Sequence, residues 1–194
     1  MRSISTDYMT QPAAAINADL VKVGLMYTYS PNIQLFKCPA DRRTAFFGKP
    51  GGPPSGVTDQ PTVRSYSMNG YLAPIIDSFM TSTAPLNGNY RIFRKQVDLN
   101  PIGSANCFVV LDENPWSIND GWFCSDNANQ SWVDKPATYH NNAGGLSFAD
   151  GHSEIHKWRD SNLINFLGPY GAAAPAQPGV GDIDWLMQHS SVHK

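Results

Sequence analysis

Two stretches of the chain have clear patterns of hydrophobic and polar positions. In residues 13–29 apolar side chains recur at helical spacing, which predicts an amphipathic helix. The four positions are Ile16, Leu20, Val23 and Tyr27. In residues 106–111 the side chains that follow Asn106 form a continuous apolar run, which contains the β-branched Val109 and Val110. Such a run predicts a strand at the centre of a sheet.

A β-hairpin is predicted over residues 145–158. Asp150-Gly151 supplies the turn, because both residue types readily adopt positive φ. After the turn two sets of side chains alternate along the chain, so every second side chain shares one face of the second strand. The side chains on that face are His152, Glu154, His156 and Trp158.

Shorter elements are predicted between loops. An alternating pattern suggests an edge strand at 64–70, and a helical turn is predicted at 161–167. Residues 182–187 predict a short helix with an acidic first turn. Glycine and proline mark 168–181 as a flexible excursion. One helix followed by a long irregular region and an antiparallel sheet indicates an α+β domain.

The composition indicates one loop-rich domain. The chain has 194 residues, including 16 Gly and 15 Pro, and only 15% are charged. The net charge of −2 and the lack of any block of like charge argue against an electrostatic nucleic-acid or membrane surface. No apolar stretch has the length of a membrane-spanning helix, and the start of the chain lacks the apolar region of a signal peptide.

The cysteines are Cys38, Cys107 and Cys124. No pair has CxxC spacing, so a zinc knuckle is not predicted. Two interpretations stay open. One is a disulfide, preferably Cys107–Cys124 because it would link the start of a strand to a nearby loop, and the other is three reduced thiols.

Six short phrases of the sequence occur in an order that is specific as a set. They are Phe36-Lys-Cys-Pro-Ala-Asp41, Arg64-Ser-Tyr-Ser-Met-Asn69, Leu111-Asp-Glu-Asn-Pro115, Ser117-Ile-Asn-Asp-Gly121, His140 with nine residues before Asp150-Gly151, and Asp184-Trp-Leu186. Together they resemble the pseudopilin-like proteins that have a prepilin-type cleavage and methylation segment and a C-terminal His-nine-Asp-Gly domain. The resemblance covers residues 20–188.

The resemblance implies a type IV pilin or pseudopilin-like α+β fold, in which an N-terminal helix packs on a small antiparallel sheet with long loops. Residues 1–194 would form one domain, with 13–29 as a remnant of that helix and 106–158 as the sheet core. The family's leader and hydrophobic helix are not recognisable, since Met1 opens into the expected globular part.

The implied role is structural. The subunit would assemble with other pseudopilin subunits or the secretion machinery in a type II secretion or type IV pilus-like filament. Its location would be periplasmic or extracellular, with an inner-membrane anchor before assembly in the full-length protein. Neither a nucleic acid nor a membrane is an expected partner of this fragment.

Carboxylates near the end of the predicted central strand are the first candidate site. Asp112 and Glu113 end that strand, Asp120 follows on a loop, and Asp150 lies at the hairpin tip. Their hard oxygen ligands suit calcium, and some major pseudopilins hold calcium in a late loop. The resemblance therefore makes a calcium site built from these four acids a reasonable interpretation. The competing interpretation is that they cap turns and accept backbone N–H groups.

The same acids allow an enzymatic alternative, a glycoside hydrolase. Glu113 would act with Asp112, Asp120 or Asp150 as the pair of carboxylates that cleaves a glycosidic bond. Aromatic side chains could stack on sugars, either in that enzyme or in a secreted glycan-binding module; the candidates are Trp116, Trp122, Trp132 and Tyr139. Packing in the core is the other interpretation of these aromatics.

The histidines near the hairpin have more than one interpretation. His152, Glu154 and His156 suit zinc or copper, and they equally suit a solvated sheet face. His140 is a base, a ligand or a structural donor, and the glycine turn that follows it favours the structural role. In that role one ring nitrogen bonds a carboxylate across the sheet, either Asp112 or Asp150, and His140, Asp150 and Gly151 form a polar clamp.

Overall fold

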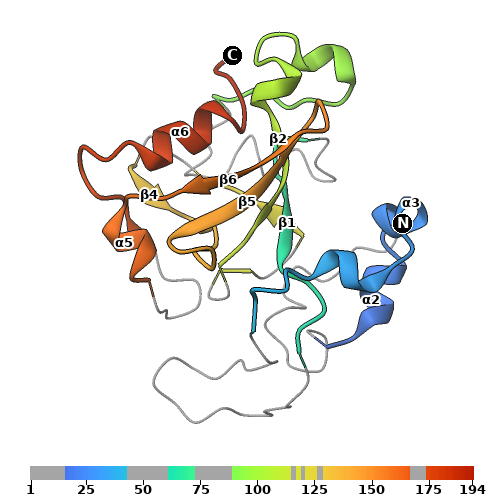
Figure 1. Ribbon diagram of the computed structural model, residues 1–194. Helices are drawn as coiled ribbons and strands as arrows, with labels where there is room; N and C mark the ends of the chain where they lie inside the picture. The colour runs from blue at the N-terminus through green and yellow to red at the C-terminus, as the bar shows by residue number, and fades with distance from the viewer. Residues whose placement is uncertain are drawn as a thin grey trace.

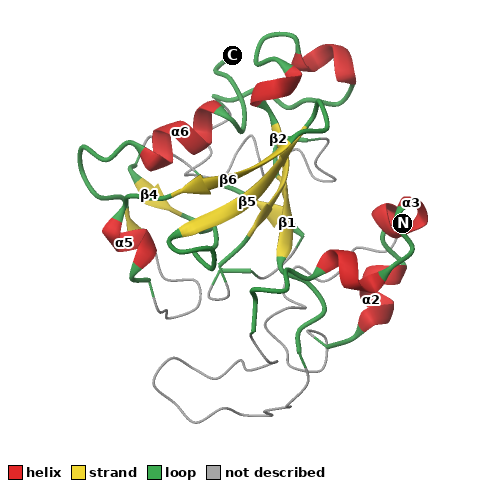
Figure 2. Cartoon of the chain, viewed as in Figure 1, coloured by secondary structure: helices red, strands yellow, loops and turns green. Residues whose placement is uncertain are grey.

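The computed structural model describes residues 16–42, 61–72, 89–114, 117–118, 121–125, 129–166 and 174–194. A five-stranded sheet forms the centre of this part of the molecule, and a two-stranded sheet lies beside it (Figures 1 and 2). Among the described residues there are four α-helices, of which only α6 (Asp182–Gln188) reaches seven residues. The protein is therefore mostly β.

The central sheet is mixed and has the strand order β3-β1-β2-β5-β6. β1 pairs parallel to β3, and the other neighbours are antiparallel. The strands are β1 (Tyr66–Asn69), β2 (Phe108–Asp112), β3 (Trp122–Phe123), β5 (Ala143–Phe148) and β6 (Ser153–Lys157). The central position predicted for the apolar run is confirmed by β2. The edge position predicted for 64–70 is wrong, because β1 lies between β3 and β2.

The predicted hairpin is confirmed as β5 and β6, but its turn differs from the expected one. The amide N–H of Phe148 donates to the His152 carbonyl over 2.9 Å, and the Gly151 N–H donates to the Phe148 carbonyl over 3.0 Å. Gly151 has a φ of +95°. These bonds define a loop of three residues that ends in a left-handed glycine, one of the common hairpin connections.

The N-terminal arm, which we define as residues 16–38, replaces the predicted long helix. It contains two short helices, α2 (Ala18–Lys22) and α3 (Leu25–Tyr29), and a 3-10 helix, η2 (Ile33–Phe36). Gly24 separates α2 from α3 with an extended backbone, φ −73° and ψ 147°. Glycine costs a helix about 1 kcal/mol relative to alanine, which explains the break.

The predicted packing of an N-terminal helix on an antiparallel sheet is therefore wrong. Figure 1 shows α2 and α3 beyond one end of β1, far from α5 and α6 at the other side of the sheet. Of the large apolar side chains in α2 and α3, Val21 is buried, whereas Leu25, Met26 and Tyr29 are exposed. Residues 16–29 are helical only in two short pieces, and among the described residues no sheet covers their exposed apolar side chains. Residues 13–15 lie outside those described.

The helix that covers the sheet is α6, which confirms the helix predicted at 182–187. Ile183 and Leu186 join the main apolar core of the sheet. Trp185 stacks on His156 of β6 at a centroid distance of 3.6 Å. This placement follows from the apolar residues of the helix, while Asp182 and Asp184 occupy its first turn, where the helix dipole favours acidic side chains.

The chain after α6 returns to the start of the central strand. The Phe108 N–H donates to the His189 carbonyl over 2.9 Å. The Asn69 side-chain amide donates to the carbonyls of Phe108 and Ser190, at 3.0 and 2.9 Å. Ahead of β2 the chain forms two 3-10 helices, η3 (Gln96–Leu99) and η4 (Ser104–Asn106). Buried polar bonds thus join three distant segments.

The smaller sheet pairs β4 (Ser131–Trp132) with β7 (Ala174–Pro175). Helix α5 (Ser161–Ile164) confirms the helical turn predicted at 161–167, and Asp160 caps it. The Asp160 carboxylate also accepts the Trp132 indole N–H over 2.8 Å. Within the predicted excursion at 168–181, residues 168–173 lie outside those described, and β7 follows them.

All three cysteines are free and buried, so the preferred Cys107–Cys124 disulfide is not formed. Cys107 packs with Phe93 and Leu99, while Cys124 belongs to a different apolar cluster. Burial raises the pKa of the Cys107 thiol to about 11. Among the described residues no helix has the length and apolar character needed to cross a membrane.

Candidate functional site

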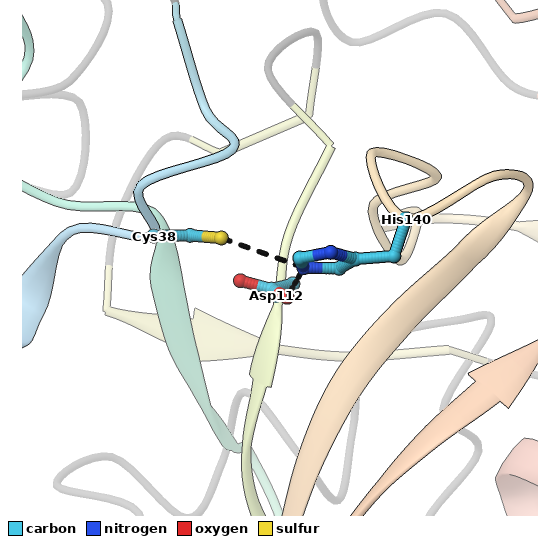
Figure 3. Close-up of side chains that lie close together, drawn as sticks. All are labelled: Cys38, Asp112 and His140. Carbon is cyan, nitrogen blue, oxygen red and sulfur yellow. Dashed lines mark hydrogen bonds and ion pairs between the residues drawn. The ribbon is translucent and has the colours of Figure 1, made fainter.

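Three side chains from distant parts of the sequence meet at the end of β2: Cys38, Asp112 and His140 (Figure 3). His140 Nε2 lies 3.5 Å from Cys38 Sγ and 3.4 Å from Asp112 Oδ2. One potential ligand atom from each residue lies within 4.8 Å of the other two. Cys38 and Asp112 are buried, and His140 is half-buried. We call this group the Cys38–Asp112–His140 cluster.

The strand pairing holds Asp112. It is the last residue of β2, and its Oδ2 accepts the Gly145 N–H of β5 over 2.9 Å. A Cβ atom at Gly145 would lie 3.1 Å from the same oxygen, which is tighter than ordinary contact. The absence of a side chain at Gly145 therefore allows the carboxylate to lie against the backbone.

Hydrogen bonds to the loop before β1 hold Cys38. The Cys38 N–H donates to Ser65 Oγ over 3.1 Å, and that hydroxyl donates to Asp41 Oδ2 over 2.7 Å. Lys37 Nζ forms an ion pair with Asp41 at 2.8 Å. The Ser65 N–H also donates to the Phe36 carbonyl. The end of the N-terminal arm is thereby fixed next to Asp112.

A tight turn before β5 presents His140. Asn141 and Asn142 have positive φ values of 56° and 64°, which asparagine tolerates better than most residues. The His140 N–H donates to the Ala143 carbonyl over 3.1 Å. The turn directs the imidazole across the end of the sheet toward Asp112. Of the two carboxylates considered as its partner, Asp112 is the one it faces.

Burial dominates the electrostatics of the cluster. It raises the pKa of Asp112 and of the Cys38 thiol above their ordinary values. It also raises the pKa of Tyr66, which pairs with Asp112 across β1 and β2. In each case the low-polarity surroundings disfavour the charged form. A cation among these groups would offset that cost.

The cluster does not have the arrangement of a cysteine–histidine–aspartate catalytic triad. In such a triad one ring nitrogen takes the proton of the nucleophile and the other donates to the carboxylate. Here Nε2 faces both the sulfur and the carboxylate oxygen. A single nitrogen carries at most one proton, so it cannot serve both roles. Thiolate, imidazole and carboxylate are instead the ligand types of transition metals, zinc above all.

Glu113 is separated from Asp112 by the pleat of the strand, since neighbouring side chains point to opposite faces. Glu113 is fully buried, and its Oε1 accepts the Ser117 hydroxyl over 2.9 Å. Burial, with Asp134 nearby, raises the pKa of Glu113 well above its ordinary value. A polysaccharide has no access to this carboxyl group as the protein is folded.

The other acids of the expected calcium site do not join Asp112. Asp120 lies outside the described residues. Asp150 lies at the hairpin tip, where its Oδ1 is 2.6 Å from His152 Nδ1. A strand rises about 3.3 Å per residue, so Asp150 is about 16 Å from Gly145. The expected clamp of His140, Asp150 and Gly151 is therefore wrong, because its histidine and its turn lie at opposite ends of β5.

The aromatic candidates are scattered. Trp132 is fully buried, and its ring contacts Trp158 edge-on. Trp122 is half-buried in β3, and Trp116 lies outside the described residues. The half-buried Tyr139 donates its hydroxyl to the Glu113 carbonyl over 2.8 Å. The described aromatics thus contribute mainly to packing and hydrogen bonding.

The row His152, Glu154 and His156 does not converge on one point. His156 stacks on Trp185, and its Nδ1 lies 3.8 Å from Glu154 Oε1. His152 instead stacks on Phe148 and pairs with Asp150. Each histidine is engaged with a different neighbour.

Sequence reasoning missed Cys38 as a site residue. Cys38 and His140 are 102 positions apart, so neither periodicity nor spacing links them. The six sequence phrases contained a signal that could have linked Cys38 to the other site residues. Cys38, Tyr66, Asp112 and His140 each belong to a different phrase, and the fold brings these four phrases together.

The chain matches no family model, no curated protein and no solved structure.

Proposed function

We propose that the chain is the globular domain of a pseudopilin-like subunit, with a structural role in a type II secretion or type IV pilus-like filament. The resemblance of the six phrases supports this role. The subunit would act in the periplasm or outside the cell, and its partners would be further subunits. The proposal does not require a helix packed on the sheet. It assigns the contacts between subunits to the N-terminal arm.

The observation that carries the proposal is the position of the exposed apolar side chains. Among the described residues five of the eight large exposed apolar side chains lie on the arm: Val23, Leu25, Met26, Tyr29 and Leu35. Leu25 and Tyr29 are 69% and 84% exposed. They lie four residues apart and so share one face of α3. Apolar surface gathered in this way is typical of protein–protein contacts.

The burial of Glu113 speaks against the hydrolase alternative. A glycosidase needs two carboxyl groups that flank its substrate, and this one faces the interior. The burial of Trp132 weakens the glycan-binding alternative in the same way. A structural subunit needs neither group to be accessible, and it uses both as parts of the folded domain.

Self-association measured by sedimentation tests the proposal. The wild-type chain is expected to form dimers or larger species as its concentration rises. Replacing Leu25 and Tyr29 together by Ser should leave it monomeric, because the apolar face of α3 is lost. The matched control replaces Val97 and Ile155 by Ser, because these side chains are 63% and 61% exposed and lie away from the arm. The control should associate like the wild type.

Two results would contradict the proposal. One is a wild-type chain that stays monomeric up to about 1 mM, which corresponds to an interface weaker than about −4 kcal/mol. The other is association that the arm and control variants lose to the same degree. In that case the contact would be a general effect of apolar surface rather than a property of the arm.

A further inference from the structure

The Cys38–Asp112–His140 cluster has chemistry that the structural role just proposed does not use. We infer that it binds one Zn²⁺ ion in a tetrahedral site. The protein ligands are Cys38 Sγ, His140 Nε2 and the Asp112 carboxylate, and water completes the coordination. The ion would lie at the junction of the N-terminal arm, β2 and the turn before β5.

The spacing of the ligand atoms is the first argument. Zinc bonds are about 2.3 Å to sulfur and about 2.0–2.1 Å to nitrogen and oxygen, and tetrahedral angles then separate S from N by about 3.6 Å and N from O by about 3.4 Å. The observed distances are 3.5 Å and 3.4 Å. A direct hydrogen bond between imidazolium and carboxylate would instead be about 2.7–2.9 Å long. The two distances therefore fit a shared ion better than direct bonds.

An unpartnered carboxylate oxygen is the second, independent argument. Asp112 Oδ1 is buried and accepts no hydrogen bond from the described part of the chain, while Oδ2 takes the Gly145 N–H. The side chain of Asp112 is only 3% exposed. A buried acceptor without a partner is destabilising. A cation at the centre of the cluster, bound through Oδ2, neutralises the charge of this carboxylate and so lowers the cost of burying Oδ1 without a donor.

The charges balance in the bound state. On binding, the Cys38 thiol releases one proton to solvent and becomes a thiolate, as zinc ligation requires. The thiolate and the Asp112 carboxylate then neutralise the two positive charges of the ion, so the buried centre carries no net charge. Neighbours orient both anionic ligands: Gly145 bonds Asp112, and Ser65 bonds the Cys38 backbone. Such outer partners are usual around zinc.

The ligand types select zinc over calcium. Calcium takes six to eight oxygen ligands, whereas the cluster offers a sulfur, a nitrogen and one carboxylate. The expected calcium ligand Asp112 is kept in this proposal. Its partners change from Glu113, Asp120 and Asp150 to Cys38 and His140.

Zinc titration of the untagged, chelator-treated chain tests the inference. Calorimetry with ZnCl₂ should give one ion per chain. At a free zinc concentration one hundred times the dissociation constant, the melting temperature should rise by about 5–10 °C. An excess of chelator should reverse the rise.

Variants assign the binding to the cluster. Cys38→Ser and His140→Gln should each weaken zinc binding by more than about 100-fold, since loss of an outer partner alone costs 10–100-fold. The matched controls are Cys107→Ala, a buried thiol elsewhere, and His152→Gln, a histidine paired with another aspartate. Both controls should bind zinc like the wild type. Circular dichroism checks that each variant is folded.

Cobalt provides a readout that does not depend on stability. Co²⁺ in the site should show the absorption of a tetrahedral ion with a thiolate-to-cobalt charge-transfer band. The Cys38→Ser variant should lack that band, and Cys107→Ala should keep it. The inference fails if the folded wild type binds no zinc. It also fails if zinc affinity is the same in Cys38→Ser, or if the controls lose it to the same extent.

Discussion

The two ends of strand β5 each place a histidine beside an aspartate, and they differ in almost every other respect. At the start of the strand His140 Nε2 lies 3.4 Å from the buried Asp112, with a cysteine as a third neighbour. At the far end His152 Nδ1 lies 2.6 Å from Asp150 on an exposed turn. The same two residue types thus make a candidate metal centre at one end and a turn at the other.

Burial and the number of converging groups account for the difference. At the tip the Asp150 side chain accepts the N–H of His152, which lowers the pKa of Asp150 and completes an ordinary turn. At the start of the strand burial raises the pKa of Asp112 and leaves Oδ1 without a partner. Of the two ends, the start of the strand is the one where the aspartate is buried and a third potential ligand, Cys38, joins the pair.

The largest expected difference in stability between the two ends of β5 comes from substitutions of their glycines. A Cβ atom at Gly144 would lie 2.7 Å from the Ala137 carbonyl oxygen, so Gly144→Ala should destabilise the protein by about 3 kcal/mol. Gly151 has open space around it and only a positive φ, so Gly151→Ala should cost about 1 kcal/mol. Urea unfolding of both variants measures the two costs. Equal costs would show that the start of β5 is no more tightly packed than the tip.

Substitutions of the two aspartates should differ less in their cost to stability than substitutions of the two glycines. Asp112→Ala leaves the half-buried Gly145 N–H without its acceptor, which should cost about 2 kcal/mol in the metal-free protein. Asp112→Asn keeps an acceptor and should cost much less. Asp150→Ala removes an exposed turn contact and should change stability little. Urea unfolding in the presence of chelator compares all three, and a larger loss for Asp150→Ala would reverse the comparison.

The smallest expected effect concerns how the stability contributions of Asp112 and Asp150 change with pH, which should have opposite signs. Because the pKa of Asp112 is raised on folding, metal-free wild type should lose stability relative to Asp112→Asn as pH rises above the ordinary value of about 3.9. Because the pKa of Asp150 is lowered, wild type should gain stability relative to Asp150→Asn as pH rises toward that value.

Unfolding free energies are measured from about pH 3 to pH 7 with chelator present. The difference between wild type and variant, plotted against pH, should have opposite slopes for Asp112→Asn and Asp150→Asn. Slopes of the same sign would mean that the two aspartates do not experience different surroundings.

Local patterns account for the parts of the fold that could be predicted. β2 follows from its apolar run, the hairpin from Asp150-Gly151, and α6 from a helical segment with an acidic first turn. The long helix failed at Gly24, where periodicity continues but the backbone does not. Helical spacing alone could not show that the apolar face of the arm has no sheet to cover it.

The site could be predicted only in part, since it depends on contacts that sequence spacing does not report. Asp112 and His140 were candidates because acids at strand ends and histidines near turns are common site residues. The neighbours predicted for these two residues were wrong. The pleat of the strand turns Glu113 to the opposite face of the sheet, and Asp150 lies at the far end of β5. Cys38 enters the cluster only through the path of the loop that Ser65 and Asp41 hold.

The hydrogen bond from Asn69 to Ser190 affects how the chain folds during its synthesis. It joins residues 121 positions apart and lies in the interior beside the central strand. At translation rates of about 5–20 residues per second, roughly 6–24 s separate the synthesis of Asn69 from that of Ser190. During that interval β1 and the start of β2 remain incompletely bonded. The buried polar bonds beside the central strand are therefore completed only after Ser190 has been made.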